Sequence, residues 1–404
     1  MIEIDGATGE AGGQILRTAT GLSAITGKPF HIYNIRKGRC TQGMRPQHLT
    51  GVKAVAQLCN AKLKHAEIDS TELEFVPDKI TGGMHKFDIG TAGSIPLLLQ
   101  SLAIPATHAN MPIELDLHGG TDVKWSPTID YFREVFARYA KMFGISISVN
   151  IIKRGFYPKG GGHVIVRITS STPKPLTLTE YTEPNKINAW SIATNDLKKA
   201  HVAERIIKAF EQEIFKTTGQ NEVICIMTKS HQKQTQSDLA RGRTGLQNSD
   251  IMTEHSEAIM TKSLDNIITE LKSNDVRSKI TENNNCSKVQ YIDSLSTGCT
   301  FFAHTYHENG ACLGACAIGE KGKSAEQIGK EVAFMLKKQI DSNACADEHM
   351  ADQILPFMAL AAPQGESKIK VAKITDHVKT NIWVIEKFLA VNFSIEDNII
   401  SCRI

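Results

Sequence analysis

The 404-residue sequence contains no long hydrophobic segment. Its most apolar run, residues 95–106, holds two prolines and a glutamine, whereas a helix that spans a bilayer needs about 20 apolar residues. The first ten residues, MIEIDGATGE, lack the basic stretch and apolar core of a secretory signal. We therefore expect no membrane segment and no signal peptide.

The cysteines do not form a recognisable framework. There are nine, an odd number, and their spacing is irregular. In a long chain this favours free thiols in a reducing compartment, so we expect a cytoplasmic protein. Cys312 and Cys316 are the one close pair, and no second pair completes a cysteine-ligated zinc site.

Acidic residues are missing from one part of the chain. Lys and Arg total 46 and Asp and Glu 43, so the net charge of +3 gives no global electrostatic reason to bind nucleic acid. Residues 11–66, however, carry nine Lys or Arg and no Asp or Glu. Arginine pairs with phosphate oxygens in two-point geometry, so this stretch predicts a phosphate-bearing ligand about as well as it predicts a solvated basic surface.

The first half of the chain repeats a short strand, a glycine turn and an amphipathic helix. Residues 2–6 alternate at period two, and apolar residues then recur at helical spacing over 15–25. Similar strand and helix patterns follow at 30–35 and 49–59, at 87–93 and 97–102, and in reverse order at 129–143 and 145–152. Repeated β-α units predict an α+β fold in which sheets pack on helices.

The composition changes after residue 171. Residues 172–184 contain three prolines and four threonines and suggest a linker, and no proline occurs from 185 to 355. Residues 216–290 lack Phe, Trp and Tyr. A polar stretch of this kind has little to bury, so we expect part of it to be disordered.

Two glycine clusters and one histidine carry possible chemistry. Residues 6–13 lead a strand into a helix, and residues 154–162 lead into a strand; both would let a ligand approach the backbone. Neither fits the dinucleotide or P-loop pattern, so tight turns remain the alternative. Taken alone, His377 is more readily interpreted as a packed or surface residue than as a nucleophile.

Together the motifs resemble the RNA 3′-terminal phosphate cyclase family. The matching segments are DGAxGExGGQILR at 5–17, IRxGR at 35–39, QHLT at 47–50, GxAGS at 90–94 with Gln100, GGTD at 119–122, RGFYPKGGG at 154–162, HVAER at 201–205, ADQ at 351–353 and HxxTN at 377–381. The resemblance is dense over 1–163 and about 345–390, and weak between them. It implies a large catalytic domain (1–184 and 342–404) interrupted by a smaller α/β insert domain (185–341), with an extra segment at about 226–290.

The resemblance implies a ligase of RNA processing that uses ATP. A histidine attacks the α-phosphate to give a histidine-AMP intermediate and pyrophosphate, and AMP then passes to the RNA 3′-phosphate. The neighbouring 2′-hydroxyl finally attacks that phosphate, which yields a 2′,3′-cyclic phosphodiester and AMP. Covalent catalysis divides one difficult displacement into easier ones. The partners implied are RNA 3′-phosphate ends and ATP, without an obligate protein partner.

The resemblance also assigns roles to residues of this chain. His377 corresponds to the adenylated nucleophile, and Glu10 to the ligand of a divalent metal, Mg²⁺ or Mn²⁺. We expect Asp352 to orient the imidazole by accepting its other N–H. The remaining assignments are ATP contacts at Gln100, His349, Met350, Ala351, Asp352 and Gln353, and catalysis or RNA phosphate binding at Arg17, Arg36, Arg39 and Gln47. His349 stands where relatives carry an aromatic residue, which leaves nucleotide preference open.

Two other functions fit a part of these observations. The family includes cyclase-like proteins that lack the nucleophilic histidine and act as non-catalytic RNA-binding factors in ribosome maturation. A plain RNA-binding module would use the arginines only for the RNA backbone. The presence of His377, Glu10 and the arginines favours the enzyme over both.

Overall fold

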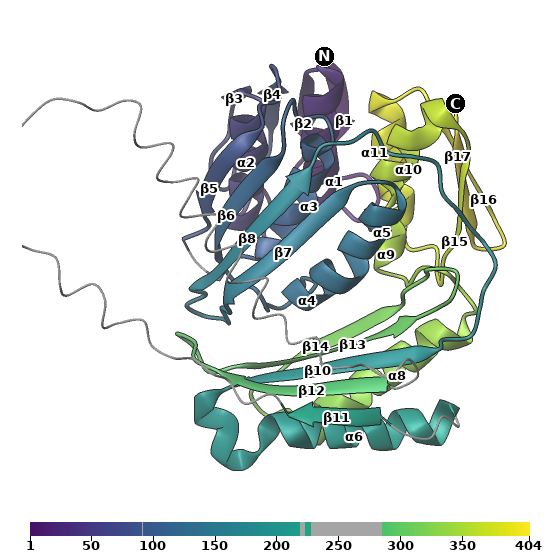
Figure 1. Ribbon diagram of the computed structural model, residues 1–404. Helices are drawn as coiled ribbons and strands as arrows, with labels where there is room; N and C mark the ends of the chain where they lie inside the picture. Colours follow the sequence, from purple (N-terminus) through teal and green to yellow (C-terminus); the bar gives the residue numbers. More distant parts are fainter. Residues whose placement is uncertain (91, 219–222, 228–284) are drawn as a thin grey trace, which may run out of the picture. The chain divides into compact units, whose positions relative to one another are not determined.

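The computed structural model describes residues 1–90, 92–218, 223–227 and 285–404 (Figure 1). The predicted extra segment at about 226–290 therefore lies almost entirely outside the described residues. Its two flanks are strands β11 (Val223–Met227) and β12 (Asn285–Ile292), which pair in parallel. The segment is thus inserted between two neighbouring strands of one sheet.

The first two sheets contain the repeated β-α units. One has the order β1-β2-β4-β3, with β1 (Ile2–Asp5), β2 (Phe30–Tyr33), β3 (Lys62–Lys64) and β4 (Leu73–Val76), and with helices α1 (Gly13–Thr26) and α2 (Pro46–Leu58). The next has the order β5-β6-β8-β7, with β5 (Gly83–Asp88), β6 (Ile113–Gly119), β7 (Ser146–Lys153) and β8 (Gly162–Thr169), and with helix α3 (Ile95–Ala106). The helix expected at 129–143 forms as α4 (Ile129–Tyr131), a π-helical turn η1 (Phe132–Phe136) and α5 (Ala137–Met142).

A third sheet belongs to the carboxyl-terminal part. Its order is β16-β17-β15-β9, with β9 (Thr177–Leu178), β15 (Ser367–Lys370), β16 (Asn392–Glu396) and β17 (Ile399–Arg403). The predicted linker at 172–184 thus contributes the short strand β9, which runs parallel to β15. The associated helices are α9 (Met350–Gln353), α10 (Leu355–Ala361), η3 (Ala362–Gln364) and α11 (Asp376–Phe388).

The middle of the chain forms the fourth sheet of the described residues. Its order is β11-β12-β10-β13-β14, with β10 (Lys186–Thr194), β13 (Cys299–Tyr306) and β14 (Gly314–Ile318). Helices α6 (Val202–Thr218) and α8 (Ala325–Asp341) pack on each other and on this sheet, and a 3-10 turn η2 (Asn195–Ala200) precedes α6. The mixture of sheets and helices confirms the predicted α+β fold.

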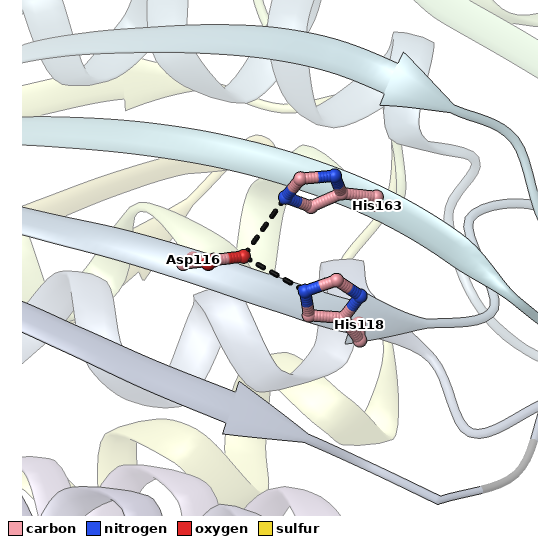
Figure 2. Close-up of side chains that lie close together, drawn as sticks. All are labelled: Asp116, His118 and His163. Atoms are coloured by element: carbon pink, nitrogen blue, oxygen red, sulfur yellow. Dashed lines mark hydrogen bonds and ion pairs between the residues drawn. The ribbon is translucent and has the colours of Figure 1, made fainter. Parts of the chain in front are cut away.

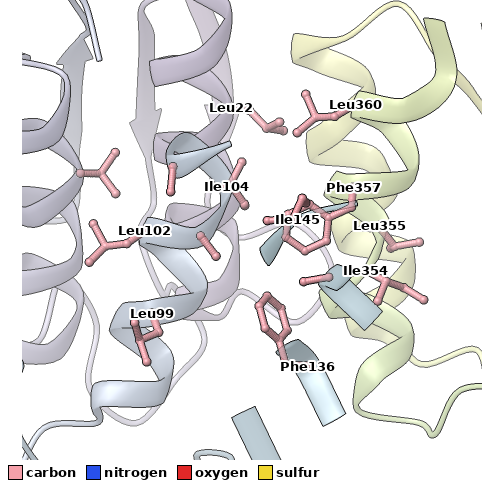
Figure 3. Packing of buried hydrophobic residues seen from close by; sticks show 14 of the residues in the cluster. Leu22, Leu99, Leu102, Ile104, Phe136, Ile145, Ile354, Leu355, Phe357 and Leu360 are labelled. Atoms are coloured by element: carbon pink, nitrogen blue, oxygen red, sulfur yellow. The ribbon is translucent and has the colours of Figure 1, made fainter. Parts of the chain in front are cut away.

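Two hydrophobic clusters hold these elements together. Figure 3 shows the larger one, where Leu22 of α1 and Ile104 of α3 lie near Phe357 and Leu360 of α10. The smaller one lies between α6, α8 and the fourth sheet, and strand β13 contributes to both: Phe301 to the smaller cluster and Phe302 to the larger. The sheet is therefore buried on both faces. The domain boundaries at 184/185 and 341/342 stay a prediction.

No helix among the described residues is both long and apolar enough to cross a bilayer.

We predict that Phe302→Ala lowers the free energy of unfolding by about 3–5 kcal/mol, because it leaves a cavity under a fully buried ring. Phe334→Ala is the matched control, since that ring is 70% exposed on α8 and should change the value by no more than about 0.5 kcal/mol. Denaturant unfolding measures both. Equal losses would contradict the assignment of Phe302 to the larger core.

Candidate active site

The predicted site residues come from the ends of helices that pack on one another. Glu10 lies in the loop before α1, and Arg17 lies on α1 itself. Asp352 lies on α9, and His377 is the second residue of α11. Helix α11 begins where the Thr375 hydroxyl accepts a hydrogen bond from the Val378 amide (3.2 Å). Because α1 packs on α11, residues far apart in sequence meet at these helix ends.

A glycine allows the Glu10 loop to approach α11. Gly9 has φ +59°, and a Cβ at this position would lie 2.1 Å from the Thr380 hydroxyl oxygen. No side chain fits in this space, and the backbone conformation also favours glycine. The glycine therefore places Glu10 directly beside His377.

His377 has a polar neighbour at each of its ring nitrogens. Its Nε2 lies 2.6 Å from Oε2 of Glu10, and its Nδ1 is hydrogen-bonded to Oε1 of Gln14. The other end of that amide, Nε2 of Gln14, donates to Oδ2 of Asp352 at 2.6 Å. The prediction that Asp352 itself accepts the imidazole N–H is wrong, because Gln14 lies between them.

The direction of these bonds sets the tautomer of the ring. The Gln14 NH₂ group faces Asp352, as the ionised form of that carboxyl requires, because a carboxylate accepts hydrogen bonds and does not donate them. The Gln14 oxygen then faces His377 and requires a hydrogen on Nδ1. In the neutral ring the lone pair consequently lies on Nε2, the nitrogen that faces Glu10.

Charge and burial act together on His377. Burial lowers the pKa of its imidazole, Glu10 opposes this, and Arg17, Arg39 and His349 lower the pKa further. The neutral ring is therefore favoured. Arg39 is also fixed against the same loop, because its Nη2 donates to the Glu10 carbonyl oxygen at 2.7 Å and lies 3.7 Å from Oε2 of Glu10.

Arg17 and Asp352 form a second charged pair near the ring. Burial raises the pKa of Asp352 to about 7, and Arg17 opposes this. Burial likewise lowers the pKa of Arg17 to about 10, and Asp352 opposes it. Asn381 links the helices that carry this pair. Its Nδ2 donates to the Asp352 carbonyl oxygen (2.8 Å), and its Oδ1 accepts from the Thr18 hydroxyl (2.5 Å).

A pocket beside this network combines polar and apolar walls. Its polar lining includes Arg17, Gln100 and Gln353, and its apolar lining includes Phe136 and Phe357. Gln100 donates through Nε2 to Oε1 of Gln353 (2.9 Å), and Nε2 of Gln353 donates to the carbonyl oxygen of residue 349 (2.7 Å). Ligand sites commonly combine an apolar lining with a few polar groups in this way.

The run 349–353 divides into two environments. His349 is exposed, while Met350 and Ala351 are fully buried and belong to the larger hydrophobic core. Their side chains therefore pack inside the protein. Asp352 and Gln353 line the pocket.

Gln47 and Arg36 lie outside the hydrogen-bond network of His377. Gln47 holds the start of α3, because its Nε2 donates to the Ser94 carbonyl oxygen (3.1 Å) and its Oε1 accepts from the Ser94 amide. Arg36 belongs to a basic cluster: burial lowers its pKa, and Arg39 and Arg45 lower it further. Its buried Nη1 has no hydrogen-bond partner among the described residues. An anion such as phosphate would satisfy it.

His48 is a further residue of the site. The sequence motifs alone did not assign a role to it. It lies so close to the start of α1 that a Cβ on Gly13 would be 2.3 Å from its Nε2. Burial lowers the pKa of His48 to about 3, with help from Arg17, Arg36 and Arg45. It is thus a neutral ring among arginines. Gln14, His48 and Asn381 all stand in recognised motifs, but only the contacts reveal their roles.

Comparison with known proteins agrees with these motifs. Residues 8–395 match the family model described as RNA 3′-terminal phosphate cyclase. Proteins named RNA 3′-terminal phosphate cyclase are similar over nearly their full lengths. The relative from Methanopyrus kandleri is 38% identical over 98% of this chain and 95% of its own. The relative from Pyrobaculum neutrophilum is 36% identical over 98% and 95%, and that from Pyrococcus furiosus is 36% identical over 99% and 96%.

We predict that Gly9→Ala destabilises the protein more than Gly38→Ala. Both glycines have positive φ, +59° and +94°, but a Cβ at residue 38 meets nothing within 4 Å. The positive φ costs about 1–2 kcal/mol in either variant, and the contact with Thr380 adds about 1–3 kcal/mol in the first. Denaturant unfolding measures the difference, and equal stabilities would show that the loop does not press on α11.

Proposed function

Because the chain belongs to the RNA 3′-terminal phosphate cyclase family, we propose that it uses ATP to convert an RNA 3′-terminal phosphate to a 2′,3′-cyclic phosphodiester. The observation that carries this proposal is the arrangement of His377, with Nδ1 held by Gln14 and Nε2 directed at Glu10. In this arrangement Nε2 is the nucleophile that forms the histidine-AMP intermediate.

The first step is nucleophilic attack by the neutral ring. The lone pair of Nε2 attacks the α-phosphorus of ATP, a P–N bond forms, and the P–O bond to pyrophosphate breaks. The ring becomes positively charged, and the Gln14–Asp352 bridge stabilises it by accepting the Nδ1–H. Nδ1 keeps its proton, so this step needs no base.

Glu10 fits the role of metal ligand. It is a half-buried carboxylate with one oxygen facing Nε2, and Mg²⁺ is commonly held by one or two carboxylates together with substrate phosphates. A cation between Glu10 and the phosphates would offset the charge of the triphosphate. Without a cation, the carboxylate and the Nε2 lone pair would repel each other, so the pair supports this use of Glu10.

The remaining steps transfer AMP and close the ring. An oxygen of the RNA 3′-phosphate attacks the histidine-bound phosphorus, which breaks the P–N bond and leaves the RNA activated. The 2′-hydroxyl then attacks the 3′-phosphorus, loses its proton and displaces AMP. The two groups are already on one ribose, so the last step benefits from a high effective molarity. In our proposal the basic cluster of Arg36, Arg39 and Arg45 holds the RNA phosphate, which is supported by the proximity of these three charges.

The pocket lined by Gln100 and Gln353 is our proposed adenosine site. The amide pair presents donors and acceptors at the edge of the pocket, and the exposed imidazole of His349 is available to stack on the base.

We also propose a cytoplasmic location, supported by the free thiols of Cys59, Cys312 and Cys345. No obligate protein partner enters the proposal.

The non-catalytic alternative has less support. A binding factor would require the basic cluster but would have no use for an imidazole that an amide joins to a half-buried carboxylate. Removing the imidazole and the carboxylate from water in a half-buried site costs stability. A catalytic role of the ring explains why the protein keeps these groups there.

Incubation with α-³²P-ATP and Mg²⁺ tests the nucleophile. We predict acid-labile, alkali-stable label on the wild-type chain, loss of that label in His377→Ala, and its retention in the control His65→Ala, whose ring is exposed and pairs with Glu72. Label that persists in His377→Ala would contradict the assignment.

The pH dependence of adenylation tests the electrostatics. Burial and the arginines lower the pKa of His377, so we predict that kcat/KM for adenylation rises with pH only at values below about 6.5, the ordinary pKa of histidine. Arg39→Gln removes one of these positive charges and should move the inflection to higher pH. An inflection above the ordinary value in the wild type would contradict this account.

A further inference from the structure

A second cluster of polar side chains lies on the outward face of strands β6 and β8. Along β6, Leu115 and Leu117 are buried in the core, while Asp116 and His118 alternate with them and point outward. His163 of β8 stands directly opposite His118 in the antiparallel register. Figure 2 shows Asp116 and the two imidazoles directed toward one another from the two strands.

The three side chains converge on one point. Oδ1 of Asp116 lies 2.9 Å from Nε2 of His118 and 2.9 Å from Nε2 of His163. The two rings are stacked, with centroids 4.3 Å apart and an angle of 12° between their planes. The three potential ligand atoms all lie within 4.8 Å of one another.

One nitrogen of the cluster lacks a hydrogen bond. Nε2 of His163 is hydrogen-bonded to Asp116. Nε2 of His118 is buried and has no hydrogen-bond partner among the described residues, although the same carboxylate is near it. Buried polar atoms are normally satisfied, and when the ring proton is on Nδ1 the Nε2 lone pair is available to a partner that accepts an electron pair. A metal ion is such a partner.

We propose that Asp116, His118 and His163 form a binding site for a divalent transition-metal ion of the zinc class. Two imidazoles and one carboxylate are donors that Zn²⁺, Co²⁺ and Ni²⁺ accept, whereas Mg²⁺ and Ca²⁺ prefer oxygen ligands alone. Nitrogen and oxygen ligands of a tetrahedral zinc ion lie about 3.3 Å apart. The two N–O separations of 2.9 Å would therefore widen by a few tenths of an ångström, and the two nitrogens, which lie within 4.8 Å of each other, would take up the same spacing.

The surroundings suit such an ion in two respects. Asp88 stands opposite His118 in the parallel register of β5 and is exposed, so a fourth oxygen ligand can come from this carboxylate or from solvent. Two exposed lysines lie near the cluster: Lys86, with Nζ 3.8 Å from Oδ2 of Asp116, and Lys153, which stands opposite His163 in the register of β7 and β8. Both long side chains can turn toward solvent. None of these residues belongs to the network around His377, so the two sites are independent.

The site would connect two central strands. Strand β6 leads into Gly120, whose carbonyl oxygen accepts a hydrogen bond from the Ile95 amide (2.8 Å) at the start of α3. An ion that joins β6 to β8 binds the folded chain and not the unfolded one, so it raises the melting midpoint as its concentration rises.

Titration of the full chain with Co²⁺ tests the proposal, because tetrahedral Co²⁺ absorbs visible light. We expect a visible band that saturates with one ion in the wild type, and an affinity at least about 100-fold weaker in His163→Ala and in Asp116→Asn, since each removes a ligand. His377→Ala should keep the band, which separates this site from the proposed active site. His65→Ala is the surface control.

Melting curves with and without Zn²⁺ complete the test. We expect Zn²⁺ to raise the midpoint of the wild type and of His377→Ala, and to leave that of the two ligand variants unchanged. Asp116→Asn keeps the size of the side chain, so it reports on the ion even if His163→Ala does not fold. A wild type without the visible band, or ligand variants that bind Co²⁺ as the wild type does, would overturn the proposal.

Discussion

The structure of the candidate site depends on one side-chain amide. Gln14 has an acceptor at one end and a donor at the other, and the Asp352 carboxylate decides which end faces His377. A second carboxylate in place of Gln14 would repel Asp352, and an apolar residue would leave both partners unsatisfied. The amide therefore orients the ring according to the half-buried acid, and it leaves the lone pair on the nitrogen that faces Glu10.

This bridge requires the helices to be held in place by the core. The three residues of the bridge lie on α1, α9 and α11, and His377 and Gln14 are 363 residues apart in the sequence. The larger hydrophobic cluster joins these helices, and Asn381 ties α11 to both of the others through Thr18 and the Asp352 carbonyl group. Charges add a second constraint, since Arg17 and Asp352 each oppose the effect of burial on the other.

Much of the fold was predictable because its local patterns are regular. Period-two strands and helical spacing indicated the repeated β-α units and hence the α+β class. The π-helical turn at 132–136 and the short strand β9 were not predicted, because both depend on tertiary packing. The extra segment at about 226–290 stays a prediction, because it lies almost entirely outside the described residues.

The sequence predicted which residues form the candidate site better than it predicted the hydrogen bonds between them. Family motifs singled out His377, Glu10 and Arg39, which the structure brings together. The role of Gln14 and the indirect position of Asp352 could not be predicted, because the direction of an amide is set by partners distant in sequence. The pairing of His118 with His163 likewise depends on strand register, which the sequence of either strand does not reveal.

The central claim, that Nδ1 of His377 carries the proton and Nε2 the lone pair, can be measured directly. Long-range ¹H–¹⁵N NMR spectra of chain labelled with ¹⁵N-histidine distinguish the two tautomers, and His377→Ala identifies the signal. With Mg²⁺ present, the account predicts the Nδ1–H tautomer at neutral pH, and a shift toward a mixture of tautomers in Gln14→Leu. A wild-type ring protonated on Nε2 alone would contradict it.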